Sequence, residues 1–233
     1  MLLRTYTFGL GLTLFPTMLS AQVLVGPPDT MAARVEACSP CHGGRGEGTS
    51  DVYFPRLAGK PSGYIYNQLL AFKNGRRRYP PMNYLLGYLP ESYLKDMADY
   101  FAEQHPPLPA PPAVTVSPEV LKLGETLVTQ GDAVRQIPAC ASCHGSTLTG
   151  MEPAIPGLLG LRPNYVSAQL GAWRYGTRTA KSPDCMQVVA AHLTETDVTA
   201  VAAYLATRPA PEKPVPAAKG SYVLPFSCGS QPD

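Results

Sequence analysis

The sequence predicts a helical protein built as two small domains in tandem that arose by duplication. Three observations predict this: sequence features that recur at a nearly constant spacing, apolar residues at helical spacing inside each repeat, and a proline-dense stretch between the repeats. The chain has 233 residues, enough for one large domain or two small ones. Its 26 prolines favour short elements over long helices or extended sheet.

The repeat is clearest in the middle of each half. A shift of 101 residues aligns the segment 55–59 with 156–160 and carries a predicted helix at 64–73 onto its second copy. Later matches, such as Leu89 with Leu193, differ by 104, so only small insertions separate the halves. The pairs that share the 101-residue shift include Pro55 and Pro156, Gly59 and Gly160, Tyr64 and Tyr165, Gln68 and Gln169, Phe72 and Trp173, and Arg77 and Arg178.

The remaining elements follow in chain order. We expect a helix over residues 30–37, a second helix that opens at Pro90, and another that resumes near Pro118. The proline-dense stretch 105–113 should be an extended spacer. We therefore predict a leader at 1–21, domains at 22–108 and 109–211, and a proline-rich tail at 212–233.

The amino terminus is typical of a secretory signal peptide. Arg4 precedes an apolar run that ends at Leu19, and small residues follow. The run is too short for a comfortable membrane span, which needs about 20 residues, so we expect cleavage after Ala21 and an exported protein. The alternative is an uncleaved membrane anchor. Charged residues make up only 15% of the chain with a net charge of +2, so no nucleic-acid partner is expected.

The pentapeptide Cys38-Ser-Pro-Cys41-His42 recurs as Cys140-Ala-Ser-Cys143-His144. Cys-X-X-Cys-His is the attachment signature of c-type haem. On a helical turn, two cysteines three residues apart share one face, so both thiols can reach the vinyl groups of one porphyrin. The adjacent histidine projects from the same face toward the iron. The sequence therefore predicts two covalently bound haem c groups, with His42 and His144 as axial ligands.

The second axial ligand of each iron should occupy matching places in the two halves. Met82 and Met186 do so: each follows a proline closely, in what we expect to be a rigid loop, and each precedes the closing helix. The other histidines, His105 and His192, fall at unmatched places. The alternative for a methionine is plain core packing. With histidine and methionine both bound, the iron has no open position, which favours one-electron exchange over catalysis.

Together, both pentapeptides, the Tyr-x-x-x-Gln-Leu helix of each half and the paired methionines resemble the dihaem cytochrome c4 family. The resemblance spans residues 30–208 and implies an all-α fold of two cytochrome c domains related by an approximate twofold axis, with haem propionates near the interface. It implies thioether bonds at Cys38, Cys41, Cys140 and Cys143, and His42/Met82 and His144/Met186 as ligand pairs. It also implies a periplasmic electron carrier that passes electrons from a dehydrogenase or a quinol-oxidising donor toward a terminal oxidase, with peripheral membrane association as an open alternative.

This chain departs from the family in its long tail and in one extra cysteine pair. We interpret Cys185 and Cys228 as a disulfide that ties the tail over the methionine loop of the second haem; the alternative is two unpaired thiols. Closing such a loop contributes about 4 kcal/mol in the chain-entropy model. Arg77 and Arg178 are candidate propionate contacts, and the alternative is a solvated turn. For Trp173 core packing is favoured over a place on an electron path.

Two other functions share part of this sequence pattern. A cytochrome subunit of a membrane dehydrogenase would differ in its partners rather than in its chemistry. A dihaem peroxidase needs an iron with an open coordination position, and the paired methionines and the scarcity of histidine speak against it.

Overall fold

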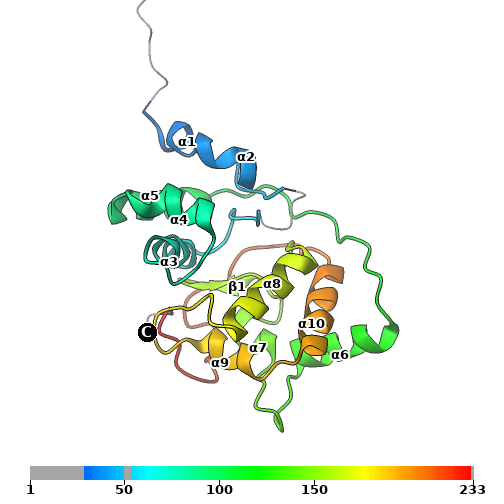
Figure 1. Cartoon of the computed structure of the whole chain (residues 1–233). Coiled ribbons are helices and arrows are strands. Elements are labelled where there is room, and N and C mark those ends of the chain that lie inside the picture. The colour runs from blue at the N-terminus through cyan, green and yellow to red at the C-terminus, as the bar shows by residue number, and fades with distance from the viewer. Residues whose placement is uncertain (1–28, 50–53, 232–233) are drawn as a thin grey trace, which may run out of the picture.

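The structure is a computed structural model that describes residues 29–49 and 54–231. Its helices fall into two groups, which lie one above the other in Figure 1, and a long connection without helix or strand joins them along one side. The predicted leader, residues 1–21, lies outside the described residues. The two groups of helices correspond to the two halves of the sequence repeat.

The first domain begins with the short elements α1 (Met31–Arg34), η1 (Glu36–Cys38) and α2 (Ser39–His42). Three longer helices follow: α3 (Ser62–Lys73), α4 (Pro80–Gly87) and α5 (Glu91–Ala102). Helix α3 packs against both α4 and α5. The core between them consists of Val35, Ile65, Phe72, Leu86, Leu94, Met97, Ala98 and Phe101.

The second domain repeats this plan with α6 (Pro118–Thr129), α7 (Cys140–His144), α8 (Pro163–Arg174), α9 (Cys185–Ala191) and α10 (Glu195–Thr207). Strands β1 (Gly150–Met151) and β2 (Ile155–Pro156) form a small antiparallel ladder that has no matching element in the described part of the first domain. Helix α10 packs between α6 and α8. The core is larger and includes Leu127, Val128, Ile137, Leu170, Val201 and Leu205.

The N-terminus of α10 shows how the sequence fixes a helix start. The Thr194 side chain accepts a hydrogen bond from the Asp197 backbone, and the Asp197 carboxylate accepts one from the Thr194 backbone. Arg135 donates to the same carboxylate at 2.6 Å. Asp197 is buried, and although burial alone would raise its pKa, the hydrogen bonds from Arg135 and Thr194 lower it. A carboxylate therefore holds the start of α10 in place.

Two expectations about local structure are wrong. The predicted helix over 30–37 stops at Arg34, because Val35 turns into the core and its backbone leaves the helical region (φ −93°, ψ 2°). The methionine segments are not loops: Met82 lies in the first turn of α4, and Met186 lies in the first turn of α9. Helix α4 begins with Pro80 because the first turn of a helix needs no intrahelical N–H donor.

The connection between the domains, residues 103–117, contains no helix or strand. Arg56 donates hydrogen bonds to the carbonyl oxygens of Pro106 and Pro107 at 2.5 and 2.9 Å. These bonds attach the start of the spacer to the first domain. The domain boundary between residues 108 and 109 lies in this connection and stays a prediction.

Helices α6 and α10 approach each other most closely at Gly124. A Cβ at this position would lie 2.1 Å from the Ala200 carbonyl oxygen, a backbone atom of α10. We expect Gly124→Ala to lower the free energy of unfolding by about 1–3 kcal/mol, because the helices must separate to admit the methyl group. Urea unfolding followed by circular dichroism measures this change.

Gly171 on α8 supplies the matched control. A Cβ at Gly171 would meet no atom within 4 Å, so Gly171→Ala should stabilise the protein by about 0.5–1 kcal/mol through helix propensity. Equal stability of the two variants would contradict the close approach of α6 and α10.

Candidate haem sites

The two predicted proximal histidines are held in the same way. His42 ends α2 and His144 ends α7, and both side chains are buried. The Nδ1 atom of His42 lies 2.9 Å from the Pro55 carbonyl oxygen, and that of His144 lies 2.7 Å from the Pro156 carbonyl oxygen. A carbonyl can only accept, so Nδ1 carries the proton and Nε2 keeps its lone pair for a metal.

Burial sets the protonation state of these histidines. It lowers the pKa of both imidazoles, which favours the neutral form. Neutral imidazole is the form that binds iron. The geometry and the charge state of both side chains therefore suit an axial ligand.

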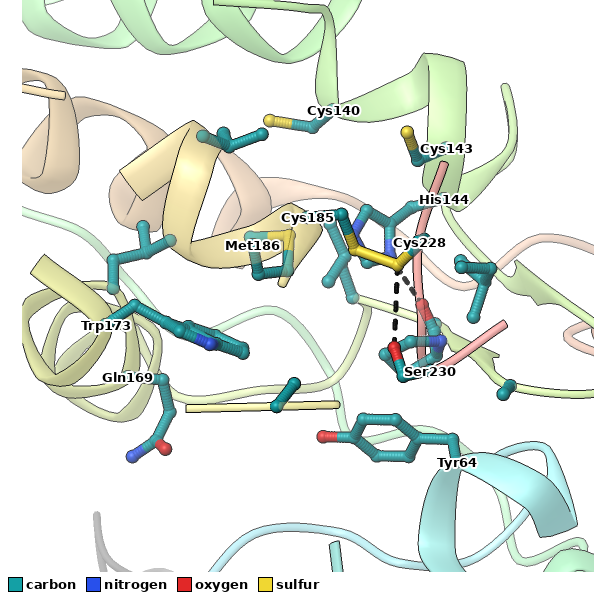
Figure 2. Close-up of a pocket in the computed structure, with 18 of the residues that line it drawn as sticks. Tyr64, Cys140, Cys143, His144, Gln169, Trp173, Cys185, Met186, Cys228 and Ser230 are labelled. Atoms are coloured by element: carbon teal, nitrogen blue, oxygen red, sulfur yellow. Dashed lines mark hydrogen bonds between the residues drawn. A yellow bond between two sulfur atoms is a disulfide. The ribbon is translucent and has the colours of Figure 1, made fainter. Parts of the chain in front are cut away.

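The four cysteines of the pentapeptides are half-buried and unpaired. Burial raises the pKa of Cys140 to about 12 and also raises that of Cys38 and Cys143. Burial therefore favours the neutral thiol at Cys38, Cys140 and Cys143. Figure 2 shows Cys140 and Cys143 above His144 on one side of a pocket in the second domain.

That pocket brings together the sequence-predicted residues of the second site. Cys140, Cys143, His144 and Met186 all line it, and Met186 reaches it from α9. Most of the remaining lining is apolar and comes from several helices and the tail, including Leu158, Leu161, Val166, Leu170, Val189, Val201, Leu205, Leu224 and Phe226. In the first domain, Cys38 and Met82 pack against the same apolar core. His105 and His192, which the sequence disfavoured as ligands, are both exposed.

An unpartnered donor tests whether this pocket fits a haem. The indole Nε1 atom of Trp173 is buried and has no hydrogen-bond partner within the described residues, and the side chain lines the pocket (Figure 2). A buried N–H without an acceptor is costly. A propionate carboxylate is the acceptor that a haem would bring. The pentapeptide, the apolar walls and this donor fit haem together.

Arg77 and Arg178 meet at the interface between the domains. Their backbones form an antiparallel bridge, and both side chains are buried. The solvated-turn alternative is therefore wrong for this pair. Arg77 stacks on Phe72 and Arg178 on Trp173, with the guanidinium carbon 4.6 and 3.7 Å from the ring centroids.

The polar contacts of the two arginines are reciprocal across the interface. Arg77 donates to Tyr165 and Gln169 of the second domain at 2.8 Å each. Arg178 donates to Gln68 of the first domain at 2.7 Å and to Tyr64 at 3.4 Å. In the part of the chain that the structure describes, neither guanidinium forms an ion pair. Burial, and next the charge of Arg77, lower the pKa of Arg178.

The predicted disulfide is present: Cys185 is bonded to Cys228 across 43 residues. It joins the first residue of α9, next to Met186, to the tail. The tail also pairs with the body of the domain, because Ala217 exchanges backbone hydrogen bonds with Gly150 and Glu152. Leu224, Phe226 and Ser230 thereby line the pocket, and Ser230 is seen beside Cys228 in Figure 2.

Sequence reasoning missed Lys60 as a pocket residue. Lys60 belongs to the first domain but lines the pocket of the second. Tyr64 and Gln68 do so too, and their places in the repeat had marked them, whereas Lys60 matches a leucine, Leu161. The contact between domains, which a single sequence does not reveal, brings Lys60 there.

The chain resembles curated electron-transfer proteins. It is 34% identical over 196 residues to the thiosulfate dehydrogenase electron acceptor of Thiomonas intermedia, covering 82% of this chain and 88% of the relative. It is 34% identical over 175 residues to cytochrome c4 of Pseudomonas aeruginosa, covering 74% and 84%. No protein-family model matches the chain.

Solved structures agree. Reduced cytochrome c4 from Pseudomonas stutzeri superposes with a TM-score of 0.66 at 30% identity and covers 76% of this chain and 95% of its own. The thiosulfate dehydrogenase TsdBA of Marichromatium purpuratum gives a TM-score of 0.67 at 32% identity over 74% of this chain. The matching region spans only 36% of the TsdBA chain.

Two helical domains in tandem, with a Cys-X-X-Cys-His segment and a buried histidine in each, define a c-type cytochrome, an electron-transfer protein that carries haem c. The identities and coverages then give the family. The chain belongs to the cytochrome c4 family. The predicted all-α fold of two tandem cytochrome c domains is confirmed, and so is the prediction of an electron-transfer protein rather than an enzyme.

The disulfide should contribute measurably to stability. We expect the double substitution Cys185→Ser and Cys228→Ser to lower the free energy of unfolding by up to about 4 kcal/mol, because the open chain gains conformational freedom. Chemical denaturation measures this loss, with Ser227→Ala at an exposed neighbouring position as the control. A non-reduced wild-type protein whose intact mass includes both thiol hydrogens would contradict the bond itself.

Proposed function

We propose that this protein carries two covalently bound haem c groups, one in each domain, and moves single electrons between redox proteins. Cys38 and Cys41 would hold the first haem by thioether bonds, and Cys140 and Cys143 the second. The axial pairs would be His42 with Met82 and His144 with Met186. Domain boundaries at 22–108 and 109–211, with a tail at 212–233, would give each haem its own domain.

The matched histidine geometry is the observation that carries this proposal. Each pentapeptide histidine is buried, with Nδ1 bonded to the carbonyl oxygen of a proline from the repeat, at 2.9 Å in one domain and 2.7 Å in the other. Core packing of a histidine does not require the same carbonyl twice. The same carbonyl in both domains is expected if each histidine must present its Nε2 atom in the same orientation.

When bound, haem supplies a one-electron couple at its iron. The chain would hold the iron from both faces, through histidine on one side and methionine on the other, and would keep water away with apolar walls. A thioether ligand favours ferrous iron and raises the reduction potential. Arg77, Arg178 and the Trp173 N–H would donate hydrogen bonds to the propionates where the two domains meet, because these donor groups are buried and have no anionic partner among the described residues.

The cellular role we propose is that of a periplasmic carrier between a dehydrogenase or quinol-oxidising donor and a terminal oxidase. A signal peptide at residues 1–21 would direct export. Of the helices in the described ranges, none has the length and apolar character needed to cross a bilayer. Haem c of the cytochrome c4 type fits an exported carrier.

A second, narrower role is favoured by the comparisons. Two relatives, from Thiomonas intermedia and Stutzerimonas stutzeri, are named thiosulfate dehydrogenase electron acceptors, at 34% and 36% identity. TsdBA resembles this chain over about a third of its own length. We therefore propose a haem-containing thiosulfate dehydrogenase as the electron donor.

Methionine ligation can be tested by the weak red absorption band that ferric haem shows when methionine is bonded. We expect Met82→His and Met186→His each to remove about half of this band, because each abolishes one of two Fe–S bonds. Met151→Leu, at a buried methionine in β1, should leave the band intact. If the band keeps its full intensity after one of these substitutions, the methionine that was replaced is not an iron ligand.

The donor can be tested by stopped-flow spectroscopy. Mixing the oxidised protein with thiosulfate dehydrogenase and thiosulfate should reduce both haems, and leaving out thiosulfate should abolish the reaction. The double variant Cys38→Ala and Cys41→Ala, which lacks one attachment, should accept half as many electrons per chain. Reduction no faster than with thiosulfate alone would rule out this donor while leaving the carrier function standing.

A further inference from the structure

Lys60 belongs to the first domain, but its positively charged side chain reaches into the second domain. It stands between Gly59 and the N-terminal end of α3, and its side chain is only 9% exposed. The Nζ atom donates to the Gly157 carbonyl oxygen at 2.9 Å, across a sequence separation of 97 residues. Lys60 also lines the pocket that contains Cys140, Cys143, His144 and Met186.

The carbonyl that Lys60 contacts belongs to the loop that orients His144. Gly157 directly follows Pro156, whose carbonyl oxygen accepts the hydrogen bond from His144 Nδ1 at 2.7 Å. The ammonium group therefore contacts the loop that holds His144, the proposed ligand of the second haem. Its charge is felt at His144, whose pKa is lowered by burial and, to a lesser extent, by Lys60.

This charge has no anionic partner within the described residues. The neighbouring charged side chain is Arg56, another cation, whose guanidinium bonds to backbone carbonyls such as that of Ala58. Tyr165 is the nearby group that favours the charged form. Burial lowers the pKa of Lys60 to about 8, so the ammonium persists at neutral pH.

The first haem site receives no such lysine from the repeat. The shift of 101 residues that pairs Gly59 with Gly160 pairs Lys60 with Leu161. Leu161 is apolar and lines the pocket of its own domain. Lys60 is thus a charge difference between two sites that otherwise share their predicted ligand types.

We propose that Lys60 tunes the second haem: its ammonium group, supplied by the first domain, raises the reduction potential of the haem at His144 and so separates the potentials of the two haems. This inference rests on the proposed haem ligation. Reduction adds one negative charge at the iron, and a cation nearby stabilises the reduced state. Because the intervening medium is protein rather than water, the interaction is screened little.

Redox titration of the intact protein tests the proposal. The background variant Met82→His should lower the potential of the first haem, so that the remaining high-potential couple belongs to the second. In this background we expect Lys60→Met to shift the ferrous-to-ferric ratio of that couple toward ferric by about threefold to tenfold at a fixed potential, where tenfold is 59 mV.

Three further variants separate charge from structure. Lys60→Arg keeps the charge and should retain the potential. Lys60→Gln keeps a hydrogen-bond donor for Gly157 without the charge, so its potential should fall with that of Lys60→Met. Lys95→Met, which removes an exposed lysine of the first domain that does not line the pocket, should leave the couple unchanged.

The outcomes are distinct. Lys60 has no selective role if Lys60→Gln and Lys60→Met keep the wild-type potential in haem-loaded protein. The same conclusion follows if, in protein that retains Met82, the Lys60 substitutions shift the potentials of both haems equally. If Lys60→Met does not fold, Lys60→Gln and Lys60→Arg decide the question through the difference between their potentials. A wild-type protein without c-type haem would instead contradict the proposed function.

Discussion

The hydrogen bond from a buried histidine to a backbone carbonyl is the constraint on which each domain depends. A buried imidazole must stay neutral and must have its N–H satisfied. The chain meets both demands with the carbonyl oxygens of Pro55 and Pro156. The loop that presents each carbonyl is fixed in turn by backbone bonds of 2.8 Å, from Leu57 to Gly46 in one domain and from Leu158 to Leu148 in the other. Loop, histidine and pentapeptide therefore form one rigid unit.

The interface between the domains follows a different principle, because it buries like charges. Two guanidinium groups share two glutamine oxygens, and each stacks on the aromatic ring of its own domain. Neutral acceptors alone compensate buried cations poorly. Such an interface is stable when an anion completes it, and the haem propionates that we propose would supply two per pocket. Cofactor binding and domain association would then reinforce each other.

The sequence was enough to predict the helical fold, the duplication and the residues of each pentapeptide, because these depend on local spacing. It also paired Cys185 with Cys228, since no other cysteines remained outside the pentapeptides. The sequence did not predict the secondary structure around Met82 correctly. Pro80 fits the first turn of a helix as well as a loop, and the predicted loop is the start of α4. The sequence could not show that Lys60 or Trp173 faces the second pocket, because those contacts are set by how the domains and their helices pack.

Duplication gave the two sites the same predicted ligand types, so a difference between them must come from their surroundings. The second pocket is partly closed by residues from outside the helices of its own domain. The tail crosses it and is fixed at Cys228, and the first domain contributes Lys60 and Tyr64 to its wall. In the first domain, by contrast, Tyr84 in α4 and Tyr88 just after α4 are exposed at 76% and 90%. A buried haem beside a fixed cation holds an electron more firmly than a haem near an open surface, because water stabilises the ferric charge. With one haem in each domain, as we propose, this asymmetry of the surroundings would favour electron flow from the first domain to the second.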